Sequence, residues 1–221
     1  MGSFHPRVED LPAEFPVFPL AGALLLPRGK LPLNIFEPRY LAMTEDSLSA
    51  GRMFGMVQPD YSAHAGETGP ALFKVGCLGR LVSFSETDDG RYLITLVGVI
   101  RFDLARELAI RRGYRRVKGE YGRFASDLDP SARPIGVERE TLLAELRAYF
   151  ACNGFDANWD AIRRMPDDTL VTTLCMVCPF EPAEKQALLE AATDEERGRA
   201  LLALLQMGSA GAKDGPTGRT C

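Results

Sequence analysis

The segment at residues 15–40, FPVFPLAGALLLPRGKLPLNIFEPRY, places five prolines among mostly apolar residues. Proline has no backbone N–H to donate, so it is disfavoured in central strands and occurs at strand edges, strand starts and bends. The apolar runs between the prolines have the length and composition of short β-strands. The segment therefore predicts a bent, partly unpaired sheet, which fits a small irregular β-barrel with exposed edges.

Short apolar or alternating runs, separated by glycine and proline, continue to about residue 124 and predict further strands. The expected strands are residues 17–20, 23–26, 31–36, 53–58, 72–78, 80–86, 91–97, 100–107 and 114–121. Asp88-Asp89-Gly90 is expected to form a hairpin turn, because glycine tolerates the positive φ of tight turns. One helix is expected among the strands, beginning at Pro38 and ending near Gly51.

The hydrophobic period becomes helical beyond Ser131, as the spacing of Leu142, Leu146 and Tyr149 indicates. Capping residues, prolines and glycines divide this part into five expected helices, the last of which ends at Gly208. We therefore expect an α+β chain. Its expected parts are an N-terminal tail (1–13), a β-rich domain (14–124), a helical domain (125–208) and a disordered tail (209–221).

The bulk composition is that of an ordinary globular protein, with 46% hydrophobic residues in 221. The 26 basic and 30 acidic side chains give a formal net charge of -4, so the whole molecule has no field that attracts nucleic acid or anionic lipid. The sequence contains no apolar run of membrane-spanning length, and its N-terminus lacks the pattern of a signal peptide. We therefore expect a cytoplasmic protein whose partners are neither membranes nor nucleic acids.

An ordered series of motifs begins with Phe18-Pro19-Leu20, Leu31-Pro32-Leu33 and Ile35-Phe36-Glu37-Pro38-Arg39-Tyr40. The series continues with Val75-Gly76-Cys77-Leu78, with Asp89-Gly90-Arg91-Tyr92 and with a helical stretch at residues 182–205. Over roughly residues 14–207 it resembles the Lon protease N-terminal domain family, also called the LON substrate-binding domain. The resemblance implies a PUA-like β pseudo-barrel followed by a C-terminal helical bundle.

The same resemblance implies a non-catalytic binding role, namely recognition of unfolded or exposed apolar polypeptide segments in protein quality control. A full Lon protease also carries an ATPase module and a Ser–Lys peptidase module, whereas this sequence contains no G-x-x-x-x-G-K-[ST] phosphate loop. We therefore expect no enzyme activity, no cofactor and no bound metal. The expected partners are unfolded or partly folded polypeptides, and whether a separate protease or chaperone joins them is left open.

A bent sheet with unpaired edges can accept an extended strand through backbone hydrogen bonds, while apolar grooves take up its side chains. The expected binding surface consists of exposed apolar residues from segment 15–40 and from the neighbouring strand 53–58. The candidate contact residues are Phe36, Arg39, Tyr40, Met53 and Met56. Two of them, Phe36 and Tyr40, are also expected in the core, and Glu37 and Arg39 are expected to form an ion pair at the strand-to-helix turn.

The basic run at residues 111–118 supports an alternative hypothesis, an RNA-binding PUA-like module. Its cationic and aromatic side chains are of the kind that contact phosphates and stack on bases: Arg111, Arg112, Tyr114, Arg115, Arg116 and Lys118. Charged residues also protect exposed sheet edges from pairing with other sheets, and Glu107 and Glu120 dilute the local positive charge. We favour this structural role for the run.

Cys175-Met-Val-Cys178 is the one pattern in the sequence that is typical of a metal or redox site. The other cysteines, with His5 and His64, supply no second ligand pair, and a helix C-terminus does not lower a thiol pKa. We expect Cys175 and Cys178 to fill the core and the five cysteines to be reduced. A small hydrolase is a third hypothesis, because His64 lies in a loop, but no nucleophile elbow accompanies it.

Overall fold

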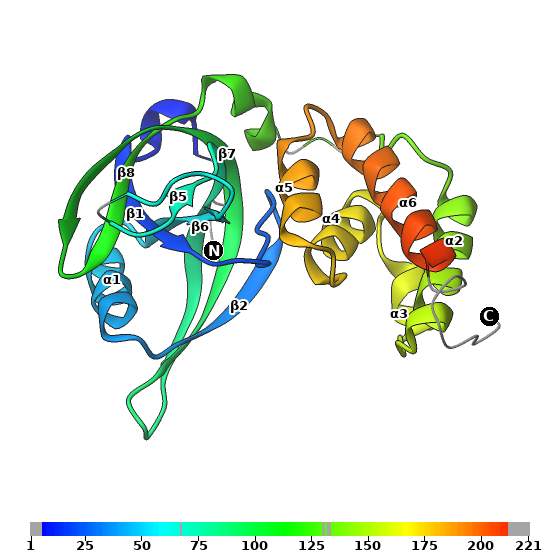
Figure 1. The fold of residues 1–221 in the computed structure, drawn as a ribbon, viewed down its shortest axis with the longest axis horizontal. Helices are drawn as coiled ribbons and strands as arrows, with labels where there is room; N and C mark the ends of the chain where they lie inside the picture. The colour runs from blue at the N-terminus through cyan, green and yellow to red at the C-terminus, as the bar shows by residue number, and fades with distance from the viewer. Residues whose placement is uncertain (1–5, 67, 130, 132–133, 212–221) are drawn as a thin grey trace. The chain divides into compact units, whose positions relative to one another are not determined.

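The computed structural model describes residues 6–66, 68–129, 131 and 134–211 (Figure 1). The chain divides into two compact units, Met1–Pro130 and Ser131–Cys221. All strands of the described residues lie in the first unit, and the second is helical. The expected α+β class is therefore confirmed.

The first unit consists of strands with a few short helices. Its strands are β1 (Glu14–Pro19), β2 (Lys30–Ile35), β3 (Met53–Val57), β4 (Pro59–Asp60), β5 (Ala71–Leu72), β6 (Val75–Glu86), β7 (Tyr92–Arg111) and β8 (Tyr114–Glu120). Its helices are η1 (Val8–Asp10), α1 (Pro38–Ser49) and η2 (Gly122–Leu128). The helix α1 begins at Pro38 and ends just before Gly51, as its sequence predicts.

A closed ring of strands forms the expected barrel. In the described chain the strand order is β2-β7-β6-β3-β1-β8, and β8 pairs back onto β7. The proline-rich strand β1 pairs in parallel with β3 and antiparallel with β8, so it is a barrel strand with two partners. By contrast, β2 pairs with β7 alone among the described strands, and it provides the exposed sheet edge that the prolines predict.

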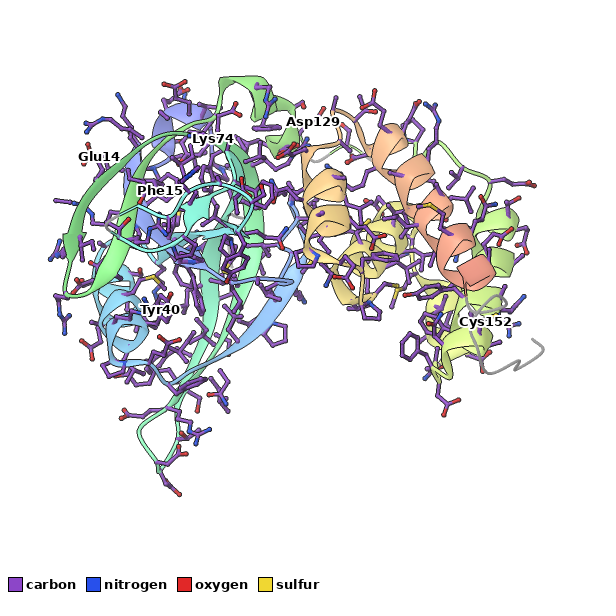
Figure 2. All side chains as sticks on the ribbon, in the orientation of Figure 1. Glu14, Phe15, Tyr40, Lys74, Asp129 and Cys152 are labelled. Atoms are coloured by element: carbon purple, nitrogen blue, oxygen red, sulfur yellow. The ribbon has the colours of Figure 1, made fainter. Side chains whose placement is uncertain are left out.

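Apolar side chains fill the barrel, with the rings of Phe15 and Phe102 packed edge to face at 4.9 Å between centroids. Figure 2 shows Phe15 among the barrel strands. The expected strand at residues 23–26 is wrong: this segment is an irregular connection whose three leucines, Leu24, Leu25 and Leu26, are buried. A short apolar run indicates burial without distinguishing a strand from a buried connection.

The strands β6 and β7 are longer than the sequence predicts. Residues 91–97 and 100–107 were expected as two strands, but β7 continues through Gly98, and β6 continues through Gly79. The hairpin that joins β6 to β7 at Asp88-Asp89-Gly90 is confirmed, since the Gly90 N–H donates to the Thr87 carbonyl (2.9 Å) and Gly90 has a φ of 78°.

Parts of the expected N-terminal tail (1–13) dock on the barrel. Leu11 is buried, and the Tyr121 hydroxyl donates to the Pro12 carbonyl (2.6 Å). Burial raises the pKa of Tyr121, as expected for a phenol whose ionised form would lose hydration. Residues 1–5 lie outside the described residues.

A buried ion pair fixes η2 to the barrel. The Arg101 guanidinium donates from Nε to Asp127 Oδ2 and from Nη2 to Asp127 Oδ1, both at 2.9 Å. The backbone N–H of Arg101 donates to Oδ2 as well (3.0 Å), and the guanidinium lies 4.5 Å from the ring centroid of Phe124. These contacts extend the first unit beyond residue 124, where the sequence suggests that the β-rich domain ends.

The second unit is a bundle of helices around a leucine-rich core. The helices are α2 (Arg139–Asn153), α3 (Trp159–Arg164), α4 (Asp167–Val177), α5 (Pro182–Glu190) and α6 (Asp194–Gly211). The expected cap Thr193 holds the start of α6, because the Glu196 N–H donates to Thr193 Oγ1 (3.1 Å). The Glu196 carboxylate accepts from the N–H of Ala192, one residue before the cap (3.0 Å). The helix runs beyond the expected end at Gly208, and residues 212–221 of the expected disordered tail lie outside the described residues.

Candidate functional site

Three neighbouring strand segments extend beyond the part of the barrel that β3 and β8 cover. They are β2, residues 81–86 of β6 and residues 92–97 of β7. We call these segments, with Phe36 directly after β2, the sheet arm. Among the described strands, β7 is its central strand, and β2 and the end of β6 are its edges (Figure 1).

The sheet arm carries most of the large apolar side chains that the described part of the first unit exposes. These residues are Phe36, Val82, Phe84 and Leu93, whereas Tyr61 and Ile110 lie elsewhere. Leu93 pairs directly with Asn34 of β2, which places both on one face of the arm. Phe84 pairs with Ile94 and therefore lies on the opposite face, where its ring contacts that of Tyr92 at 4.9 Å. Each face of the arm thus exposes a large apolar side chain, Leu93 on one and Phe84 on the other, although Ile94 beside Phe84 is buried.

Phe36 is the most exposed large apolar residue of the arm. Its side chain is 61% exposed, so the expectation that it belongs to the core is wrong. The Arg91 guanidinium lies 5.9 Å from its ring centroid, and Arg91 itself pairs with Asp89 (2.8 Å). The sequence did not point to Val82, Phe84 and Leu93, because only the β6–β7 register shows which residues of these runs face solvent.

Two of the five candidate contact residues are inaccessible. Tyr40 is 6% exposed and packs on Phe18 with 4.1 Å between ring centroids, and Met56 is 2% exposed in β3. Met53 is half-buried at the start of the same strand. The expectation that strand 53–58 lines an exposed patch is therefore wrong, because β3 lies between β1 and β6 in the barrel.

The turn between β2 and α1 contains the expected ion pair. Arg39 donates from Nε and Nη2 to Glu37 Oε2, at 2.9 and 2.8 Å. The Arg39 guanidinium also lies 4.5 Å from the Tyr40 ring centroid. The pair is partly exposed and keeps both charges at the surface beside the exposed Phe36.

The basic run at residues 111–118 is largely neutralised by carboxylates from other parts of the first unit. Arg112 donates from Nη1 to Asp46 Oδ1 and from Nη2 to Glu45 Oε2, both at 2.8 Å. Arg115 forms a two-pronged pair with Glu107, at 2.7 and 3.0 Å. Weaker contacts join Arg111 to Asp46 (3.3 Å) and Arg116 to Glu14 (3.6 Å).

A hydroxyl–carboxylate contact completes this cluster. The Tyr114 hydroxyl donates to Asp46 Oδ2 (2.6 Å), and burial together with this bond raises the pKa of Tyr114 to about 12. The same hydrogen bond, helped by Arg112, holds the pKa of Asp46 below its usual value. The cluster fixes the β7–β8 hairpin to α1, so a phosphate would have to displace these carboxylates to bind most of these arginines. These ion pairs speak against the RNA hypothesis. The expectation that the run protects an exposed sheet edge is also wrong, because β8 pairs with β1 on one side and with β7 on the other.

The described cysteines of the helical unit differ in redox state. Cys175 and Cys178 are free, buried thiols at the C-terminal end of α4, and burial raises the pKa of each to about 12. They are therefore protonated and unreactive at neutral pH. Cys152 is disulfide-bonded, which contradicts the expectation that all cysteines are reduced.

Other candidate chemistry finds little support in the described residues. They contain no group of three or more His, Cys, Asp or Glu side chains placed to hold a metal ion. His64 is an exposed loop residue, and His5 lies outside the described part of the chain. None of the described helices has the length and apolar character needed to cross a membrane.

Comparison with known families identifies the chain. The model of the "ATP-dependent protease La (LON) substrate-binding domain" matches residues 14–207. The chain belongs to this LON substrate-binding domain family. Within the matched region, the barrel, the sheet arm and all five helices of the second unit are therefore parts of a LON substrate-binding domain.

Similar solved structures show the same fold. A Lon N-terminal domain protein from Xanthomonas campestris is 22% identical, with a TM-score of 0.56 over 86% of this chain and 97% of that chain. The N-terminal domain of the Mycobacterium avium complex Lon protease is 15% identical, with a TM-score of 0.59 over 87% and 98% of the two chains. The combination of barrel and helical bundle is thus a property of Lon N-terminal domains.

Curated relatives are much longer proteins. A Lon protease from Anaeromyxobacter dehalogenans (strain 2CP-C) is 27% identical over 94 residues, which is 42% of this chain and 11% of the relative. Lon protease 2 from Sorangium cellulosum (strain So ce56) is 28% identical over 133 residues, which is 60% of this chain and 16% of the relative. The matched region thus spans a small part of these relatives' length, and the family match covers the substrate-binding domain without a protease or ATPase domain.

Proposed function

We propose that the first unit binds unfolded polypeptides and exposed apolar segments through the sheet arm, without catalysing a reaction. The observation that supports this most is the group of exposed apolar side chains on the arm of a substrate-binding domain. Part of the proposal is a role in protein quality control, in which a separate protease or chaperone acts on the bound chain.

The physical basis is the burial of apolar surface. Complete burial of a leucine or phenylalanine side chain is worth about 1.5–3 kcal/mol relative to exposure. Phe36 and Leu93 are exposed in the free protein, so a client that covers them gains part of this free energy. Unfolded chains present such apolar segments, whereas folded proteins bury most of theirs. The arm therefore favours unfolded clients.

Leu93 provides a direct test, because Ile110 offers a matched control. Both residues lie on β7 and are 47% exposed, but only Leu93 belongs to the sheet arm. Leu93→Asp should weaken binding of a permanently unfolded polypeptide, reduced and carboxymethylated lactalbumin, by about ten-fold, since placing a charge in a desolvated contact costs ~1–3 kcal/mol. Fluorescence anisotropy with the labelled client measures this effect.

Ile110→Asp should bind the client as the wild type does, and the melting temperatures of both variants should stay near the wild-type value, because both side chains are solvent-exposed. Equal loss of affinity in the two variants would assign the effect to charge in general. Full affinity in Leu93→Asp would show that the sheet arm does not bind the client.

A further inference from the structure

The outer edge of β2 has a defined hydrogen-bonding pattern. Lys30 lies opposite Val97 in the antiparallel β2–β7 pair, and the Gly98 N–H donates to the Gly29 carbonyl (2.9 Å). In an antiparallel ladder this bond makes Lys30 and Val97 a pair that exchanges no direct hydrogen bonds. The backbone groups of Lys30 therefore point away from β7, toward the open edge.

Because the ladder alternates, the direction of the backbone groups at Lys30 fixes the direction at every other residue of β2. Leu31, Leu33 and Ile35 direct their backbone groups to β7, whereas Pro32 and Asn34 direct theirs to the open edge. The position of Pro32 agrees with this assignment, because a residue without an N–H cannot donate to the ladder. Among the described residues, no further hydrogen bond occupies the edge groups of Lys30 or Asn34.

The open edge thus presents N–H groups at Lys30 and Asn34 and carbonyl groups at Lys30, Pro32 and Asn34. This spacing of donors and acceptors matches the main chain of an extended polypeptide, whose own N–H and C=O groups alternate between its two sides. The side chains beside the edge are apolar on one face, where Leu31 and Leu33 lie half-buried, and polar or proline on the other.

We propose that the client binds as an added strand along the outer edge of β2. This inference rests on the proposed function and specifies its binding mode: the occupant is an extended segment of about five to seven residues, with apolar side chains at alternate positions. The client backbone pairs with the edge groups of Lys30, Pro32 and Asn34, and one row of its side chains extends the apolar face formed by Leu31 and Leu33. A proline in the client at a position that faces β2 removes a donor and opposes binding.

Asn34 allows the proposal to be tested with a matched pair of variants. Asn34→Pro removes an edge-facing N–H that the β2–β7 ladder does not use, whereas Asn34→Thr removes the same amide side chain and keeps the N–H. We expect Asn34→Pro to lower the affinity for reduced and carboxymethylated lactalbumin five- to ten-fold. The variant loses about one hydrogen bond to the client, and its proline ring also hinders the approach of the client backbone. Asn34→Thr should bind within two-fold of the wild type, and the melting temperatures report whether both variants are folded.

Amide hydrogen exchange in the wild-type protein supplies a second readout that needs no variant. The amides of Lys30 and Asn34 should exchange rapidly in the free protein and slowly when the client is bound. The amides of Leu31, Leu33 and Ile35 should exchange slowly in both states, because the ladder already engages them. Unchanged exchange at Lys30 and Asn34 in a saturated complex would overturn the strand-addition proposal.

The outcomes separate this proposal from the proposed function. If Leu93→Asp loses affinity while Asn34→Pro binds normally, the arm binds clients through side chains and the added strand is wrong. If the wild type does not bind the unfolded client, the proposed function itself fails. A concentration-dependent dimer of the wild type, abolished in Asn34→Pro, would show that a second copy of this chain occupies the edge instead of a client.

Discussion

Replacement of Asp127 by alanine should destabilise the first unit by about 3–5 kcal/mol, because it removes the carboxylate that pairs with the buried Arg101 guanidinium. Both side chains are buried, and the Asp127 carboxylate accepts three hydrogen bonds from Arg101, one of them from the backbone. The substitution therefore removes one buried ion pair and the acceptor of a backbone N–H, both of which join β7 to η2. Urea-induced unfolding monitored by circular dichroism measures the change in the free energy of unfolding.

A second aspartate, Asp103 of β7, serves as the control for Asp127 of η2. Asp103 pairs with Arg123 at 2.7 Å, a distance similar to those in the buried pair. Both side chains of this pair, however, are substantially exposed. Asp103→Ala should cost less than about 1 kcal/mol, as is usual for surface ion pairs. A similar cost for the two substitutions, or a cost below about 1 kcal/mol for Asp127→Ala, would contradict the role assigned to the buried pair.

Gly98→Ala should be the second most damaging substitution, with a loss of about 3 kcal/mol or more. A Cβ atom at this position would lie 2.0 Å from the Leu26 carbonyl oxygen and 2.7 Å from its carbon, and both are backbone atoms that cannot rotate away. The Arg28 N–H also donates to the Gly98 carbonyl (2.8 Å), so separation of the two segments would break a further contact. Thermal and urea denaturation of the purified variant measure the loss.

Gly122→Ala is the matched control, since a Cβ there would meet no heavy atom within 4 Å. Its free energy of unfolding should stay within about 0.5 kcal/mol of the wild-type value. If Gly98→Ala is equally neutral, the connection at residues 24–29 does not approach β7 as closely as described.

Local sequence signals predicted much of the fold. Pro38 marks the start of α1, the Asp88-Asp89-Gly90 turn marks the β6–β7 hairpin, and Thr193 with Glu196 marks the start of α6. Each signal acts within a few residues, so its effect on the local structure does not depend on which distant segments pair. The buried connection at residues 24–26 was mistaken for a strand because its apolar character reports burial alone.

The candidate site was less predictable, because exposure depends on pairing between distant segments. Tyr40 and Met56 were candidate contact residues, yet the barrel encloses Met56, and Tyr40 packs on Phe18 in the core, where it was also expected. Similarly, Arg112 appeared free until the fold placed Glu45 and Asp46 against it, from a helix more than sixty residues earlier. Leu93 was overlooked because its strand alternates weakly, and the β2–β7 register decides which of its residues face solvent.

The proposed function requires that the protein bind unfolded polypeptide in preference to the folded form of the same chain. Titration of the wild-type protein into labelled lactalbumin, either native with its disulfides intact or reduced and carboxymethylated, tests this claim by fluorescence anisotropy. We predict saturable binding of the unfolded form with a Kd at least about ten-fold lower than that of the native form, and only a weak dependence on salt. Equal affinity for the two forms, or no binding of the unfolded form, would contradict the account.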